Sequence, residues 1–312
     1  RDLHYPLRRQ RQMCIRDRAE TLNFSAAAQQ LHISQPTVSK YISALESDFD
    51  VLLFERTVNG IQLTNAGKTL IPWARRLVHE SLDLHETMLS MGEEVVGQLR
   101  ISCSTTAGKY ILPQLAGRFR RLHPGVQITI QSCTQSNVAE KLLHGDADLG
   151  VLSIEVTALQ LECQEFFTDH IVLIVSNQHP WANRSEVEPA ELLDVAFIMR
   201  EQTSGTRRAM LSALAQHDIN LNDLDVFLEV GNAEAIVTAV TSNFGVSFVS
   251  RLASTYARAW GCVVEVPVSN LDLRRQLCMA RCSTKAASRA SDAFWSFGHH
   301  PDNKDLFKLA EY

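Results

Sequence analysis

The chain has 312 residues, and its 30 lysine and arginine residues against 35 aspartate and glutamate residues give a formal net charge of −5. This length favours two or three domains. Hydrophobic residues make up 45% and charged residues 21% of the sequence, which excludes a globally disordered chain. No apolar run approaches the ~18 residues of a membrane span. The mild acidity excludes a histone-like polycation but allows a small DNA-binding head on an acidic body, because DNA binding depends on local charge.

The cysteines and the first residues of the chain bear on where the protein works. Residues 1–18 are rich in charged side chains and hold no hydrophobic segment, so we expect no signal peptide there. The seven cysteines are odd in number, scattered, and form no C-x-x-C pair. This pattern predicts free thiols in a reducing compartment, and hence a cytoplasmic protein without a metal site. A thiol-based redox sensor is the alternative, and we expect Cys103 and Cys133 to lie near each other.

The segment 25–46 predicts two short helices joined by a tight turn. Ser34 is a candidate N-cap of the second helix, and Pro36 falls in its first turn, where a missing N–H costs nothing. The buried face of this helix is defined by apolar residues at i, i+4 and i+7, namely Val38, Ile42 and Leu45. The pattern is typical of a helix-turn-helix, although any αα-hairpin would also show it.

In a helix-turn-helix, the exposed polar face of the second helix meets DNA. Glutamine hydrogen-bonds base edges, and lysine reaches guanine or a phosphate. The residues that we expect at this interface are Ser34, Gln35, Pro36, Thr37, Ser39 and Lys40. Further along, Asn59-Gly60 lies between two short β-like pieces and is a strong hairpin signal. The hairpin either forms a wing, from which Arg56 contacts the phosphate backbone, or only closes the small core.

Residues 65–96 form one long helical pattern. Its seam positions are separated alternately by four and three residues, which is the heptad spacing of a coiled coil, and they are Leu70, Ala74, Leu77, Ser81, Leu84, Met88, Met91 and Val95. A helix of ~30 residues is ~45 Å long, and a lone helix of that length with an apolar seam needs a partner. We therefore predict a dimerisation helix, with a helix that lies on its own domain as the alternative.

From residue 97 onward, β-branched runs alternate with helical stretches, which predicts a parallel α/β sheet. Ligands in such sheets bind beyond the carboxyl ends of the strands. Loops rich in serine and threonine follow several of the expected strands, where they open helices whose N–H groups favour anions. We expect two lobes with a cleft between them: lobe I at about 97–168 and 269–300, and lobe II at about 169–268.

Four short motifs occur in one order near the start of the chain. They are Phe24–Ser39, which reads FSAAAQQLHISQPTVS, then Leu45-Glu46, Leu53–Arg56, which reads LFER, and Leu63–Gly67, which reads LTNAG. Together they resemble the LysR-type transcriptional regulators.

This resemblance implies an α/β protein in three parts. A winged helix-turn-helix DNA-binding domain spans 19–64, and a linker helix at 65–96 pairs two subunits. A two-lobed effector-binding domain, similar to periplasmic binding proteins, spans 97–312. The partners that the resemblance implies are double-stranded promoter DNA, a second copy in a homodimer or homotetramer, and RNA polymerase as a further candidate.

Two stretches depart from the family pattern. The wing tip reads Thr57-Val58-Asn59-Gly60, where family members usually carry a further basic residue. The family's first helix is amphipathic, but this chain has Arg18 where an apolar residue is expected, and burying an unpaired arginine would cost several kcal/mol. The stretch Met13–Arg18 resembles translated sequencing-adaptor DNA. We therefore hypothesise that residues 1–18 are atypical and are not native coding sequence.

Mapped onto the family pattern, polar residues at strand-to-helix junctions match positions that contact effectors. They are Ser104, Thr106, Thr134, Ser136, Thr203, Ser204, Thr206 and Asn232. Hydroxyl and backbone N–H groups hold a carboxylate or an inorganic oxyanion without a charged side chain, and Arg200 or Arg207 would add a bidentate contact. Helix capping is the alternative role of each hydroxyl, but recurrence at one kind of junction favours a binding site. The identity of the effector does not follow.

Common catalytic and nucleotide-binding motifs, such as G-x-S-x-G, H-E-x-x-H and G-x-x-x-x-G-K-[ST], are absent from the sequence. We therefore expect neither an enzyme nor a cofactor. We predict a ligand-responsive DNA-binding regulator, in which a small anionic effector between the lobes alters DNA binding or promoter activation. The alternatives are a small-molecule-binding protein without a functional DNA-binding head, and a thiol-based redox regulator.

Overall fold

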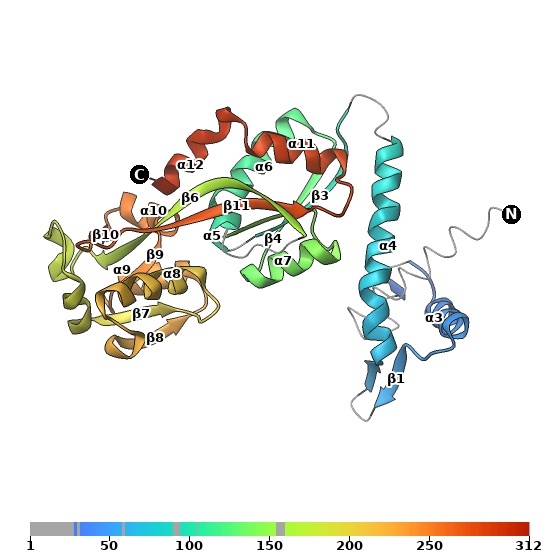
Figure 1. Cartoon of the computed structure of the whole chain (residues 1–312), viewed down its shortest axis with the longest axis horizontal. Coiled ribbons are helices and arrows are strands. Elements are labelled where there is room, and N and C mark those ends of the chain that lie inside the picture. The colour runs from blue at the N-terminus through green and yellow to red at the C-terminus, as the bar shows by residue number, and fades with distance from the viewer. Residues whose placement is uncertain are drawn as a thin grey trace. The chain divides into compact units, whose positions relative to one another are not determined.

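The computed structural model describes residues 28–29, 32–57, 60–89, 94–103, 105–153 and 160–311 (Figure 1). The chain divides into two compact units. One is formed by residues 1–94 with the short segment 144–146, and the other by residues 95–143 and 147–312. Residues 1–18, for which we hypothesise a non-native origin, lie outside the described residues.

The first unit contains a helix, a hairpin and a long second helix. These elements are α3 (Gln35–Phe49), β1 (Phe54–Thr57), β2 (Gly60–Leu63) and α4 (Asn65–Leu89). Pro36 lies in the first turn of α3, as predicted, and Val38 and Ile42 form a small core with Ala28. At the far end of α3, the Glu46 carboxylate accepts hydrogen bonds from the backbone N–H groups of Leu53 (2.8 Å) and Phe54 (3.3 Å). This contact fixes the start of the hairpin relative to α3.

Helix α4 is shorter than its heptad pattern predicts. Thr64 caps its first turn, because the Thr64 hydroxyl accepts a hydrogen bond from the Gly67 N–H at 3.0 Å. The described helix runs to Leu89, and residues 90–93 lie outside the described residues. Residues 94–96 are not helical, so the predicted end at residue 96 is wrong. Val95, the last seam position, packs instead against the core of the second unit. Val95 is apolar because of this packing, so its match to the heptad spacing does not indicate a longer helix.

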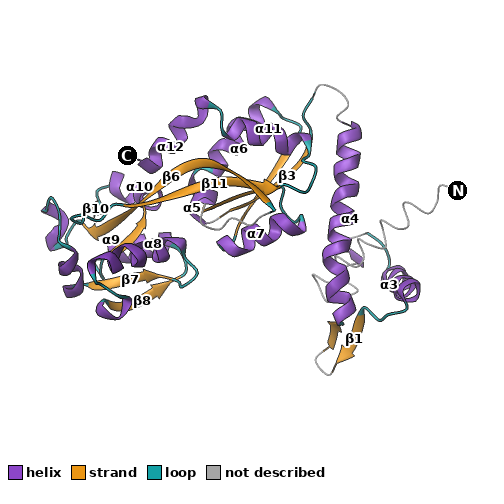
Figure 2. Cartoon of the chain, viewed as in Figure 1, coloured by secondary structure: helices purple, strands orange, loops and turns teal. Residues whose placement is uncertain are grey.

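The second unit is built on a seven-stranded sheet with strand order β10-β6-β11-β5-β3-β4 and with β9 also paired to β6. Its strands are β3 (Gly97–Cys103), β4 (Val126–Ser132), β5 (Leu149–Ser153), β6 (Leu161–Ser176), β9 (Ser247–Ser250), β10 (Val263–Glu265) and β11 (Leu273–Cys282). Strand β3 pairs in parallel with both β4 and β5. The long strands β6 and β11 run antiparallel to each other from one lobe into the other (Figure 2). They are therefore the two crossovers that the predicted lobe bounds require, because lobe I is expected at about 97–168 and again at about 269–300.

Helices and short 3₁₀ turns connect these strands. The helices are α5 (Thr105–Tyr110), α6 (Leu112–Leu122), α7 (Gln135–His144), α8 (Gly205–Leu214), α9 (Ala233–Thr241), α10 (Arg251–Ala259), α11 (Arg289–Gly298) and α12 (Lys304–Glu311). We call lobe I the part built on β3, β4 and β5, with α5, α6, α7, α11 and α12. Lobe II is the part built on β9, β10 and the parallel pair β7 (Ala196–Arg200) and β8 (Asp225–Val230), with α8, α9 and α10.

Each lobe has its own apolar core, and helices cover both faces of its sheet. In lobe I, Phe119 of α6 and Phe294 of α11 meet edge to face over one side of the sheet. Val138 and Leu142 of α7 cover the other side. In lobe II, Met210 of α8 belongs to one core cluster, while α9 belongs to the second. The parallel strands β4, β7 and β8 have their carboxyl ends at the junction of the lobes, where Ser132, Arg200 and Gly231 line one cavity. In the described part of the chain, no helix is both long and apolar enough to cross a membrane.

Candidate functional site

The first candidate site is the exposed face of α3. Ser34, Gln35, Pro36 and Lys40 are exposed, whereas Thr37 and Ser39 are half-buried. The Ser34 and Thr37 hydroxyls lie 2.8 Å apart and hydrogen-bond each other, but Ser34 makes no side-chain cap to the helix. Burial of the opposite face turns these polar groups outward. The hairpin predicted as a wing is present, with Phe54 paired to Leu63. The side chain of Arg56 lies outside what the structure describes.

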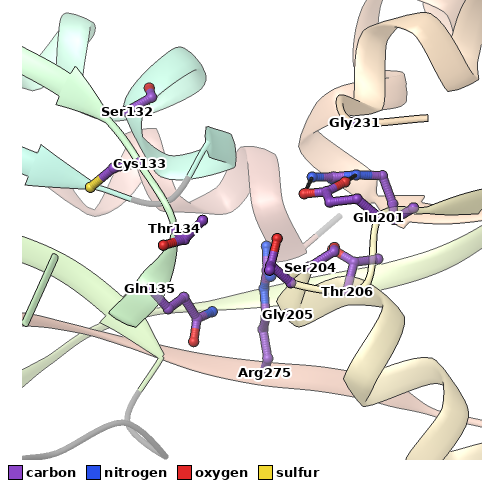
Figure 3. A pocket seen from close by; sticks show the side chains of 12 residues that line it. Ser132, Cys133, Thr134, Gln135, Glu201, Ser204, Gly205, Thr206, Gly231 and Arg275 are labelled. Atoms are coloured by element: carbon purple, nitrogen blue, oxygen red, sulfur yellow. Dashed lines mark hydrogen bonds and ion pairs between the residues drawn. The ribbon is translucent and has the colours of Figure 1, made fainter. Parts of the chain in front are cut away.

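The second candidate site is a cavity of about 270 Å³ between the lobes. It is lined from lobe I by the start of α7, from lobe II by the start of α8, and from below by β11. The lining residues are Ser132, Cys133, Thr134, Gln135, Arg200, Glu201, Thr203, Ser204, Gly205, Thr206, Gly231 and Arg275. Figure 3 shows Thr134 and Gln135 on one side and Ser204, Gly205 and Thr206 on the other, with Arg275 between them.

On the lobe I side, the start of α7 presents a buried amide. Thr134 precedes the helix, and its hydroxyl accepts a weak hydrogen bond from the Asn137 N–H at 3.4 Å. The Gln135 side chain follows and is only 5% exposed. Its Oε1 accepts a hydrogen bond from Nη2 of Arg208 on α8 at 3.2 Å. Its buried Nε2 has no hydrogen-bond partner within the described residues. A buried amide N–H₂ without an acceptor costs about 1–3 kcal/mol.

On the lobe II side, α8 begins against this amide. Ser204 is the N-cap, and its hydroxyl accepts a hydrogen bond from the Arg207 N–H at 3.4 Å. Gly205 follows, and a Cβ atom built on it would lie 2.6 Å from Gln135 Nε2 and 3.2 Å from Arg275 Nη1. Any side chain at this position would therefore push the two lobes apart or displace Gln135. The first N–H groups of α7 and of α8 thus open onto one small volume.

The charged groups of the cavity are paired within the protein. Arg275 of β11 donates hydrogen bonds from Nε (2.9 Å) and Nη2 (2.6 Å) to the buried Asp169 carboxylate. Asp169 also accepts a hydrogen bond from the Ser250 hydroxyl at 2.5 Å. Arg200 makes a bidentate pair with its neighbour Glu201 at 2.7 and 2.9 Å. The Asp169 pair holds the Arg275 guanidinium at the floor of the cavity.

The sequence-predicted effector residues divide into three groups. Thr134, Thr203, Ser204 and Thr206 line the cavity. Two others do not line it, because their side chains serve local structure. Asn232 caps α9 by accepting a hydrogen bond from the Ala235 N–H at 2.8 Å, and Ser136 is exposed beside the Thr134 hydroxyl.

The side chains of the last two predicted residues, Ser104 and Thr106, are not described. Ser104 lies outside the described residues. Thr106 lies in α5, but its side chain is not described. Of the two candidate arginines, Arg200 lines the cavity. Arg207 instead donates to the Arg200 carbonyl and to Glu229.

Sequence reasoning missed Gln135, Gly205 and Arg275. A signal existed for Arg275, because it is the residue of a mostly apolar strand that faces inward and is nonetheless charged. Gln135 opens a helix directly after a hydroxyl residue, which is the same junction that drew attention to Thr134. Gly205 appears in the sequence only as part of a polar loop, and its close approach to the opposite lobe has no local signature.

The two cysteines expected near each other are neighbours in the backbone, because the Cys133 N–H donates a hydrogen bond to the Cys103 carbonyl at 2.9 Å. Burial raises the pKa of the Cys103 thiol to about 11, although a hydrogen bond with Ser132 opposes the shift. Burial also raises the pKa of Cys133, against the influence of Lys141. Raised thiol pKa values disfavour the thiolate that oxidation requires, so this arrangement does not favour a redox sensor. Across the described ranges, no three His, Cys, Asp or Glu side chains are placed to hold a metal ion.

Comparison with known proteins agrees with this architecture. Residues 14–68 match the family described as bacterial regulatory helix-turn-helix protein, lysR family, and residues 92–300 match the LysR substrate binding domain. An uncharacterized HTH-type transcriptional regulator of Methanocaldococcus jannaschii is 33% identical over 89% of this chain and 94% of its own length. A probable RuBisCO transcriptional regulator of Synechocystis is 30% identical over 92% of this chain and 86% of its own length.

A solved structure is similar to the second unit. The CcmR regulatory domain of Synechocystis in complex with 2-PG has a TM-score of 0.60 and 27% identity, and the match covers 69% of this chain and 98% of that one. The two family matches together span the helix, hairpin and both lobes described above. The chain is a ligand-responsive DNA-binding regulator with an N-terminal helix-turn-helix and a C-terminal α/β effector domain, and it belongs to the LysR family of transcriptional regulators.

Proposed function

We propose that the effector is a small anion, held in the cavity between the N-termini of α7 and α8. The observation that carries this proposal is the Gln135 amide, which is buried in the cavity wall with its Nε2 lacking an acceptor. A ligand oxygen placed there would satisfy Nε2 and would meet the positive ends of two helices. Hydroxyls of Thr134, Ser204 and Thr206 line the same volume and are suited to the remaining oxygens.

The charged residues of the cavity lining favour, as effector, an anion with more than one oxygen. The lining contains Arg200 and Arg275 against one carboxylate, Glu201. Asp169 offsets the charge of Arg275 from beneath the floor, so helix N-termini and neutral donors supply most of the attraction. The related CcmR regulatory domain is in complex with 2-PG. We infer that 2-PG or a chemically similar anion is a suitable first probe for this chain.

Isothermal titration calorimetry of the full chain tests the anion class. The titrants are 2-PG, inorganic phosphate, and glycerol as an uncharged molecule of small size. We expect saturable binding of at least one anion and none of glycerol. The variant Gln135→Leu keeps a similar side-chain volume but removes the unpartnered amide, so it should weaken anion binding. Equal binding by parent and Gln135→Leu would remove Gln135 from the site, and binding of glycerol alone would contradict an anionic effector.

For DNA binding, we propose that the α3 face formed by Ser34, Gln35, Pro36, Thr37, Ser39 and Lys40 contacts promoter DNA. Arg56 of the hairpin would add a contact to the phosphate backbone. A footprint on promoter DNA tests whether this face makes the contact. We also propose the domain boundaries 19–64, 65–96 and 97–312. The end of the helix within 65–96 is the one point that the structure corrects.

We further propose that two copies pair through α4. Three seam side chains on the C-terminal half of the helix are exposed, with Leu77 at 45%, Leu84 at 54% and Met88 at 59%. The N-terminal half is already used, because Ile71 and Ala74 pack against the hairpin and α3. Burial of the exposed seam in a homodimer would remove this apolar surface from water. Contact with RNA polymerase and a cytoplasmic location are further parts of the proposal.

A further inference from the structure

Besides the cavity walls and the packing of α10 against α5 and α12, one carboxylate ties lobe I directly to lobe II. Glu234 lies in the first turn of α9 in lobe II. Its Oε2 is 2.6 Å from Nζ of Lys109, and its Oε1 accepts a hydrogen bond from the Tyr110 hydroxyl at 3.0 Å. Both partners lie at the end of α5 in lobe I. The three side chains therefore bridge elements that are more than a hundred residues apart in sequence and belong to different lobes.

This bridge is close to the cavity along both segments that it joins. On the lobe II side, Gly231 lines the cavity and precedes Glu234 by less than one helical turn. On the lobe I side, α5 begins two residues after the end of β3, whose last residue, Cys103, accepts a backbone hydrogen bond from Cys133 of the cavity lining. A movement of either segment with the cavity wall would carry the bridge with it. The contact is thus placed to respond to how far the lobes are open.

The ionisation states of these groups favour the contact at neutral pH. Burial on its own would raise the pKa of Glu234, but hydrogen bonds from Lys109, from backbone N–H groups and from Tyr110 lower the pKa overall. Burial and the neighbouring Glu234 carboxylate raise the pKa of Tyr110, and Tyr256 of α10 adds to this effect. The carboxylate therefore stays charged as an acceptor, while the phenol keeps its proton as a donor.

We propose that Glu234 is a positioning residue that latches lobe II to Lys109 and Tyr110 of lobe I, and so keeps the cleft closed around its effector. The proposal rests on the proposed function, because it assumes that the ligand occupies the cavity between the lobes. A ligand that touches both lobes binds only the closed form. Its apparent dissociation constant is the intrinsic value divided by the closed fraction. Loss of the latch lowers that fraction without removing any contact to the ligand.

The test compares the parent with Glu234→Ala and Tyr110→Phe, using 2-PG and inorganic phosphate as titrants in calorimetry of the full chain. A half-exposed ion pair and one hydrogen bond make modest contributions, so we expect the dissociation constant to rise about three- to tenfold in Glu234→Ala. The matched control is Asp305→Ala. Asp305 is also an acidic residue in the first turn of a helix, and it pairs with Arg118 within lobe I at 2.7 Å. The control should leave the dissociation constant unchanged.

A double variant and hydrogen exchange separate a latch from a general loss of structure. If Tyr110 acts through Glu234, the double variant Tyr110→Phe with Glu234→Ala should bind no more weakly than Glu234→Ala alone. Without ligand, amides in 105–110 and 233–241 should exchange faster in Glu234→Ala, and saturating ligand should restore their protection.

If the parent and Glu234→Ala bind the anion with the same dissociation constant and show the same hydrogen exchange, the latch is overturned. That result would leave the proposed anion site unaffected. If neither anion binds the parent, the anion class fails instead. In that case the latch is tested by hydrogen exchange without ligand. Faster exchange of 105–110 and 233–241 in Glu234→Ala than in the parent supports the latch, and equal exchange overturns it.

Discussion

Arg275 and Asp169 face each other across the two long strands that connect the lobes. They are paired in the register of β11 and β6, and the Arg275 guanidinium donates two hydrogen bonds to the Asp169 carboxylate. Asp169 is fully buried, and Arg275 is nearly so. The pair therefore lies in the crossover itself, at the floor of the cavity, where the cavity lining and the connection between the lobes share the Arg275 side chain.

Removing one member of this pair should be costly. Asp169→Ala leaves a buried guanidinium without its carboxylate, and we expect the free energy of unfolding to fall by about 3–5 kcal/mol. Urea denaturation followed by circular dichroism measures this change. The comparison variant is Asp272→Ala, since Asp272 pairs with Arg274 on the surface of the same region and its loss should have little effect. Similar stability of Asp169→Ala and Asp272→Ala would contradict the structural role of the buried pair.

A methyl group at Gly205 should close the binding site. The added Cβ in Gly205→Ala would lie 2.6 Å from Gln135 Nε2, and this contact is too short to persist. We expect anion binding in calorimetry to weaken by at least about tenfold, which corresponds to ~1.4 kcal/mol. Thermal stability should change little, because the atoms that the new methyl group meets are the far ends of the flexible Gln135 and Arg275 side chains.

The control for this variant is Gly117→Ala in α6. A Cβ at Gly117 meets no atom within 4 Å, so the variant should bind the anion like the parent and gain slightly in helix stability. If Gly205→Ala also binds like the parent, the close approach of α8 to Gln135 is not part of the site.

The overall architecture was predictable because it depends on local patterns. Alternating strand-like and helical segments indicated a parallel sheet, and this holds for β3, β4 and β5 and for the pair β7 and β8. The remaining strands correct the prediction, because β6 pairs antiparallel with β9, β10 and β11, and β11 pairs antiparallel with β5. The end of the linker helix was not predictable from spacing alone. Val95 continues the heptad pattern, yet it is apolar because it packs against the core of the effector domain.

DNA binding should depend on Lys40. This side chain is exposed on α3, so Lys40→Ala should weaken binding about three- to tenfold and reduce the salt dependence of the affinity. Fluorescence anisotropy with labelled promoter DNA at several salt concentrations measures both effects. Lys308→Ala, which removes an exposed lysine from α12, should leave both unchanged. A loss of anion binding in Lys40→Ala would point to unfolding rather than to a DNA contact.

Thiol alkylation should be slow at Cys103. Burial raises its pKa to about 11, so roughly one molecule in 10⁴ carries the thiolate at pH 7. We expect the rate of iodoacetamide labelling, read by mass spectrometry, to rise about tenfold per pH unit between pH 7 and 9. Cys278 should behave in the same way, because burial and the neighbouring Cys163 raise its pKa to about 12. Labelling of Cys103 at neutral pH as fast as that of N-acetylcysteine would reopen the redox alternative.

The candidate site was only partly predictable, because it is assembled from distant segments. Thr134 and Ser204 lie at strand-to-helix junctions that a sequence pattern can locate. Ser136 and Asn232 share that pattern, but Asn232 caps a helix and Ser136 is exposed beside the Thr134 hydroxyl. Thr134 and Ser204 differ from Ser136 and Asn232 in that the opposite lobe faces them across the cavity. Arg275 reaches the cavity only because β11 returns from lobe II beside β6, and no local feature of the sequence encodes that pairing.

A footprint on the DNA upstream of the protein's own gene, taken with and without 2-PG, tests ligand-responsive regulation most directly. We expect a protected stretch longer than one ~10-bp turn, because more than one head binds. We also expect the anion to change the extent or the half-saturation of protection in the parent but not in Gly205→Ala. Identical footprints at every concentration of an anion that calorimetry shows to be bound would contradict a ligand-responsive regulator that works through this cavity.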